Sequence, residues 1–176
     1  MTSGGKENVA QGTGHKIYAR HSGVAKPYRL SVPLIKRCIH EVLRFERADA
    51  PCEVSVLITD DRGIQKINRE FRNIDEPTDV LSFPMQEISS PGWAAIDQEA
   101  TDQETGLLPL GEIVLSAERV INQAREFGQS CERETAYLTA HAALHLLGYD
   151  HIDEAEGKKM MRERENSILK EMGFRC

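Results

Sequence analysis

Residues 132–147 constrain the fold more than any other stretch, because they have the length of a helix and are apolar nearly all round. A helix without a broad polar face has to be buried on every side, so we expect this one at the centre of the fold. It carries His141 and His145, and the chain reaches His151 six residues later. The central helix therefore also carries candidate functional residues.

The spacing of these histidines predicts a metal site. Imidazoles four residues apart on a helix share a face and lie about 6 Å apart along its axis. Gly148 can leave the helix in a left-handed conformation, which lets the chain turn back and present His151. Three neutral nitrogens around Zn²⁺ leave one position for water, as in catalytic sites. Imidazole also accepts nickel, copper and iron, so the prediction is one Zn²⁺ ion or another divalent transition metal.

The same spacing, H-x3-H-x2-G-x2-H, occurs in the metzincin zinc proteases. Those enzymes carry a glutamate directly after the first histidine as the general base. Here that position is Ala142, which cannot accept a proton. The sequence thus indicates a zinc hydrolase other than an ordinary protease, with a peptidase kept as an alternative.

Size and composition predict one domain. The chain has 176 residues, of which 40% are hydrophobic. We assign residues 16–176 to a single domain and expect the Gly-rich, polar residues 1–15 before it to be disordered. No apolar run of about 18 residues or signal-peptide core occurs, so we expect no membrane partner and a cytoplasmic location. The net charge of −6 means that any RNA binding would depend on a local positive patch or on the metal.

Hydrophobic periodicity predicts strands that alternate with helices, followed by helices alone. This order is typical of an α+β domain, with a small mixed β-sheet packed with helices around a central metal-bearing helix. Three helices are expected to begin at capping side chains, which are Ser31, Ser116 and either Asp60 or Asp61. The expected strands cover residues 16–19, at a sheet edge, and residues 53–59, 80–83 and 110–115.

The last helix is expected to begin at a capping box over residues 153–156. Met161, Glu165, Ile168 and Met172 follow at helical spacing. Such a stripe belongs more often to the core than to a cofactor pocket, and we interpret it as core.

Residues 85–109 stand apart because they are acidic, lack lysine and arginine, and contain the only tryptophan, Trp93. Connections of this length are uncommon unless they form lids or are disordered. We predict a mobile, solvated loop, with a functional lid as the alternative.

A second motif joins a helix end to a strand over residues 67–84. Pro77 is expected to end the helix, Thr78 or Asp79 to hydrogen-bond the turn, and Arg72 to lie near the helix C-terminus. Taken alone, Arg72 fits an ordinary interaction with the helix dipole. Read together with the histidines, however, residues 70–84 and 141–151 resemble the two signatures of the YbeY family, Y-R-x-x-D-x-P-T-D-V-L-S-F-P and H-G-x-L-H-L-x-G-Y-D-H.

The resemblance runs over roughly residues 52–173. It implies a metal-dependent, single-strand-specific endoribonuclease that acts in rRNA maturation, notably at the 3′ end of the 16S small-subunit rRNA, and in ribosome quality control. The implied partners are single-stranded RNA, rRNA, and the ribosome or small-subunit proteins. By the same resemblance His141, His145 and His151 are the zinc ligands and Arg72 is the catalytic or RNA-contacting residue. The chain departs from the family pattern at three positions, namely Phe71, Glu112 and Ala142.

Two questions stay open at this stage. Asp150 is either a general base or the residue that orients a ligand imidazole through a hydrogen bond, and attack by the substrate's own 2′-hydroxyl would dispense with an external nucleophile. The alternative function is a zinc-stabilised ribosome-assembly factor without significant nuclease activity, which the acidic net charge favours.

Overall fold

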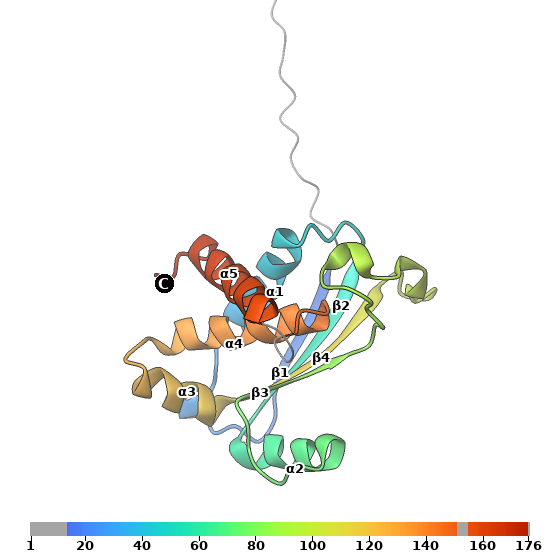
Figure 1. Ribbon diagram of the computed structural model, residues 1–176. Helices are drawn as coiled ribbons and strands as arrows, with labels where there is room; N and C mark the ends of the chain where they lie inside the picture. Colours follow the sequence, from blue (N-terminus) through green and yellow to red (C-terminus); the bar gives the residue numbers. More distant parts are fainter. Residues whose placement is uncertain (1–13, 151–154, 176) are drawn as a thin grey trace, which may run out of the picture.

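A four-stranded sheet in the order β1-β2-β4-β3 organises the molecule (Figure 1). The computed structural model describes residues 14–150 and 155–175. Strands β1, β2 and β4 run parallel, and β3 pairs antiparallel with β4. The sheet is therefore mixed, as predicted, with the expected edge strand β1 on one side and β3 on the other. The strands are β1 (Lys16–His21), β2 (Cys52–Thr59), β3 (Val80–Pro84) and β4 (Leu108–Ser116).

The helices divide between the two faces of the sheet. Helices α1 (Val32–Phe45), α4 (Cys131–Leu146) and α5 (Ala155–Glu171) lie together over one face, and α2 (Asp61–Arg72) packs on the other (Figure 1). Helix α3 (Ala117–Glu126) follows β4 and contacts α4. Helix α4 touches α1, α3, α5, β3 and β4, which confirms the prediction of a central, buried helix. None of the helices in the described part of the chain is long and apolar enough to cross a membrane.

Side chains at the helix starts act as the sequence predicts. Ser31 accepts a hydrogen bond from the Leu34 backbone N–H, Asp60 from that of Gly63, and Ser116 from that of Arg119. These contacts satisfy N–H groups that have no partner inside the helix. The capping box expected over residues 153–156 falls mostly outside the described residues.

The end of α2 differs from the prediction. Asn73 adopts a left-handed conformation with φ of 57°, and its N–H bonds back to the Arg69 carbonyl. Asparagine tolerates this conformation because its short side chain is compatible with it. Asn73 therefore ends the helix, four residues before Pro77.

Residues 85–107 are more closely packed than predicted. Trp93 is 6% exposed and its Nε1–H donates to Asp49 Oδ1 at 2.7 Å. The Gly92 N–H donates to the Leu147 carbonyl at the end of α4, at 2.9 Å. The expectation of a solvated loop is thus wrong for Trp93 and Ile96, although the acidic side chains of the segment are exposed. Its mobility stays a prediction.

Candidate active-site cleft

A cleft of about 570 Å³ lies between α4 and the edge strand β3. It brings together Arg72, from the end of α2, with His141 and His145, some seventy residues further along the chain. Asp150 lies at the same cleft, so four of the five predicted site residues share one surface. The complete lining is Arg72, Asp79, Val80, Ser82, Pro84, Gln86, Ile88, His141, Ala142, His145, Gly148, Tyr149 and Asp150.

The two helix histidines point toward each other. His141 Nε2 and His145 Nε2 are 3.1 Å apart, and the rings meet edge to face with centroids 4.6 Å apart. Two imidazoles on one tetrahedral Zn²⁺, at Zn–N distances of about 2.0–2.1 Å, place their nitrogens about 3.3–3.4 Å apart. The pair therefore fits a shared ion. His151, the third predicted ligand, lies outside the described residues, and within them no three metal-binding side chains converge.

Glu165 contacts the far side of the His141 ring. Its Oε1 lies 2.7 Å from His141 Nδ1, and its side chain is 5% exposed. The helical spacing of Glu165 with its apolar neighbours predicts a core residue and does not reveal this contact. The available signal was a carboxylate at a position that otherwise holds buried apolar residues, since such groups seldom enter a core unpaired.

The turn after α4 is shaped by Gly148. Its φ of 81° confirms the predicted left-handed exit from the helix. The Gly148 N–H donates to the His145 carbonyl at 3.0 Å, and the next N–H donates to the Leu144 carbonyl at 3.1 Å. A side chain at Gly148 would meet Ile88 Cγ2 at 2.8 Å. Both the conformation and the space therefore require glycine here.

Tyr149 anchors the chain immediately after this turn. Its hydroxyl donates to Glu46 Oε2 at 2.7 Å, while Arg164 Nε donates to Glu46 Oε1 at 2.9 Å. Burial, together with the hydrogen bond to Glu46, raises the pKa of Tyr149 to about 12, so the hydroxyl remains a donor at neutral pH. The network ties the residues that lead to Asp150 to both α1 and α5.

Arg72 forms part of the wall opposite the histidines. Its Nη2 donates to the Ser82 carbonyl on β3 at 3.4 Å, and its guanidinium carbon lies 6.0 Å from the centre of the Phe83 ring. A guanidinium has five N–H donors, and the bond to Ser82 uses one of them. Arg69, one turn earlier on α2, pairs instead with Asp75 at 3.6 Å and does not line the cleft.

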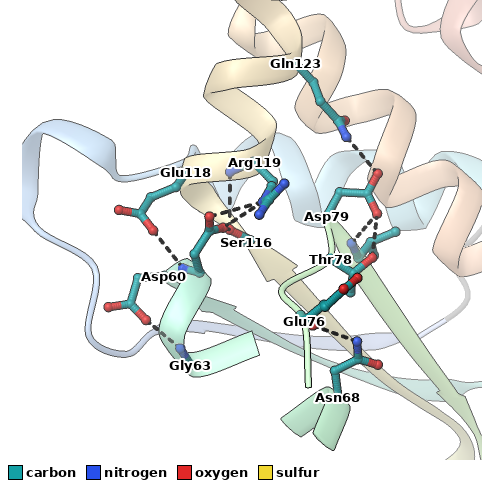
Figure 2. Close-up of polar contacts among 12 residues, drawn as sticks. Asp60, Gly63, Asn68, Glu76, Thr78, Asp79, Ser116, Glu118, Arg119 and Gln123 are labelled. Atoms are coloured by element: carbon teal, nitrogen blue, oxygen red, sulfur yellow. Dashed lines mark hydrogen bonds and ion pairs between the residues drawn. The ribbon is translucent and has the colours of Figure 1, made fainter. Parts of the chain in front are cut away.

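The segment between α2 and β3 is fixed by side-chain hydrogen bonds (Figure 2). Asp79 accepts from the Val80 N–H at 2.7 Å and from Gln123 on α3 at 3.0 Å, and Thr78 donates to it at 3.2 Å. Asn68 donates to the Glu76 carbonyl at 2.8 Å. The prediction that Thr78 or Asp79 hydrogen-bonds the turn is confirmed, and the network holds the end of α2 that carries Arg72 beside β3.

A second hollow of about 640 Å³ lies on the face of the sheet that α2 partly covers. Its lining includes Tyr18, Phe71, Phe83 and Glu112 but no histidine. Its size alone does not make it a reaction centre, because it lacks the paired imidazoles and the adjoining arginine of the first cleft. The chemistry therefore points to the cleft between α4 and β3.

Known proteins are similar to this chain in sequence and in fold. The sequence profile described as "Endoribonuclease YbeY" matches residues 25–173. The chain belongs to the YbeY endoribonuclease family. Proteins named endoribonuclease YbeY from Lachnoclostridium phytofermentans and Clostridium kluyveri are 44% and 46% identical to it over 140 and 142 residues, which are 77% and 78% of this chain and 84% and 86% of theirs. Membership of this family supports an endoribonuclease role for the chain.

The fold is also similar to the solution structure of TM1509 from Thermotoga maritima. The two chains share 25% sequence identity and superpose with a TM-score of 0.54. The match covers 89% of this chain and 91% of the other. The α+β architecture of this chain is therefore similar to that of a solved structure whose sequence identity is lower than that of the two relatives named above.

Proposed function

We propose that the chain is a zinc-dependent, single-strand-specific endoribonuclease of rRNA maturation, acting at the 3′ end of 16S rRNA and in ribosome quality control. The observation that carries the proposal is the convergence of two imidazole nitrogens, 3.1 Å apart, in the cleft that Arg72 also lines. Membership of the YbeY family supports the nuclease part. The rRNA site and the quality-control role rest on the resemblance of the two sequence signatures.

In this proposal the two walls of the cleft have different tasks. His141 and His145, completed by His151, hold the ion, which when bound supplies an activated water and polarises a phosphoryl oxygen. Arg72 holds the non-bridging oxygens of the scissile phosphodiester with its planar, permanently charged guanidinium. Asp150 orients a ligand imidazole or accepts a proton beside it.

The acidic net charge of −6 shapes how such an enzyme finds its substrate. Sequence-independent RNA affinity comes mainly from lysine and arginine contacts to phosphates, which an acidic protein offers sparingly. We therefore propose that rRNA is presented by the ribosome or by small-subunit proteins, and that Arg72 is a local contact at the reacting phosphate.

The test is cleavage of an end-labelled single-stranded RNA by zinc-replete protein. His145→Ala and Arg72→Ala are prepared identically, with Arg69→Ala as the matched control, because Arg69 lies one turn earlier on α2 and does not line the cleft. We expect cleavage by the parent and the control. Loss of at least about 100-fold is expected in both cleft variants, with zinc still bound in Arg72→Ala.

The other outcomes are equally informative. Equal cleavage in all four preparations would reveal a contaminating nuclease. Zinc lost from Arg72→Ala would make Arg72 a structural residue. Absence of cleavage in every preparation, together with rescue of ribosome maturation in cells by His145→Ala, would replace the nuclease with the ribosome-assembly factor. A 5′-phosphate on the downstream product would exclude attack by the 2′-hydroxyl.

A further inference from the structure

Helix α5 sends a carboxylate to the cleft from behind. Glu165 lies on the buried face of α5 between Met161 and Ile168, and it is 4% exposed. Its Oε1 is 2.7 Å from His141 Nδ1, on the side of the ring away from His145. This contact joins two helices whose bonded residues are 24 positions apart in the chain.

The contact determines which nitrogen of His141 carries a proton. An ionised carboxylate can only accept a hydrogen bond, so Nδ1 is the donor. When the ring is neutral, Nε2 then presents its lone pair toward His145 and the cleft. We propose that Glu165 is a positioning residue that holds His141 in this tautomer and orientation so that Nε2 binds a divalent transition-metal ion. The inference rests on the metal site of the proposed function and adds to it a residue on α5.

The charge balance around Glu165 supports this role. Burying a carboxylate is costly unless a positive charge compensates it. The buried carboxylate of Glu46 has such a partner in Arg164, at 2.9 Å. Within residues 14–150 and 155–175, no lysine or arginine forms an ion pair with Glu165. A cation bound at Nε2 would supply the compensating charge through the imidazole ring.

The test measures zinc affinity by competition with a chromophoric chelator, which needs no RNA and no turnover. Glu165→Gln removes the charge but keeps an acceptor for Nδ1–H, and Glu165→Ala removes both. Glu163→Gln is the control, because Glu163 is on the same helix with a side chain that is 65% exposed. We expect affinity to fall about 10- to 100-fold in Glu165→Gln, further in Glu165→Ala, and not in the control.

A second measurement reports on the ring directly. In metal-free protein, long-range ¹H–¹⁵N correlation spectra distinguish the two imidazole tautomers. We expect His141 to be Nδ1–H in the parent and in Glu165→Gln, and to shift toward Nε2–H in Glu165→Ala. Should the alanine variant not fold, the isosteric Glu165→Gln still decides the affinity comparison.

The outcomes separate this inference from the proposed function. Zinc binding that is as tight in both Glu165 variants as in Glu163→Gln would overturn the positioning role and leave the metal enzyme standing. A parent protein that binds no zinc would overturn both.

Discussion

Ala142 distinguishes this cleft from that of a metalloprotease. It lines the cleft directly after the first histidine and is 1% exposed. A glutamate at this position is the general base of the metzincin proteases, whereas alanine has no group that accepts a proton. With alanine, α4 packs closely beside the sheet, and the proton chemistry has to come from elsewhere in the cleft or from the substrate.

Replacing Gly148 tests the turn after α4 at the scale of one residue. We expect Gly148→Ala to lower the unfolding free energy by about 2–3 kcal/mol, because left-handed strain and displacement of Ile88 add together. Zinc affinity should also fall, since the turn leads to His151. Urea denaturation and chelator competition measure the two effects.

Gly128 provides the control for this change. It is also left-handed, with φ of 62°, but an added Cβ there meets nothing within 4 Å. Gly128→Ala should therefore cost only the strain, about 1–2 kcal/mol, and leave zinc affinity unchanged. Equal losses of stability in the two variants would mean that the contact with Ile88 carries no weight.

At the scale of elements, the sequence predicted correctly those features that depend on neighbouring residues, namely the burial of a helix and the caps at helix starts. The apolar character of residues 132–147 predicted a buried α4, and Ser31, Asp60 and Ser116 cap their helices because the cap contacts lie three residues away. Trp93 was misjudged because its hydrogen-bond partner, Asp49, lies 44 residues earlier and leaves no local signal. The position of Glu165 in a buried stripe indicated that it needs a polar partner, but the sequence did not identify that partner, because His141 lies on another helix 24 residues earlier.

The packing of Trp93 predicts how the segment 85–107 behaves. Trp93→Ala should lower the unfolding free energy by about 3 kcal/mol, because it removes a buried indole and its hydrogen bond to Asp49. Limited proteolysis should then cut this segment faster, while the remaining fragments stay folded. Asp49→Asn, which keeps an acceptor, is the control. Equally fast cutting in the parent would show that the segment is mobile even with Trp93 in place.

At the scale of the whole molecule, stability should depend on pH through histidines outside the cleft. Burial, and then the neighbouring His40, lower the pKa of His15 below its usual 6.5. The Cys52 backbone N–H donates to His15 Nδ1 at 3.3 Å. This hydrogen bond requires that Nδ1 carry a lone pair and no proton. The unfolded chain therefore binds a proton that folded His15 does not, in the range between the lowered value and about 6.5.

The sign of the effect follows from this difference. The stability contributed by neutral His15 is complete above about pH 6.5 and decreases as pH falls toward the folded-state pKa. We expect the unfolding free energy of the metal-free protein to rise as pH increases toward about 6.5, and to rise less steeply in His15→Gln. Urea denaturation at several pH values measures both slopes. Identical slopes in the two proteins would assign the dependence to other groups.

The burial of α4 on every side has a consequence for how this protein can vary. Ten of its residues are buried, from Glu134 to Leu146, whereas α2 buries only Ile64 and Asn68. Substitutions at most positions of α4 therefore disturb packing. The sequence of the cleft wall that carries the histidines should accordingly change little between relatives. The wall built from α2 and β3 is open to change, so divergence in RNA preference between relatives should accumulate there.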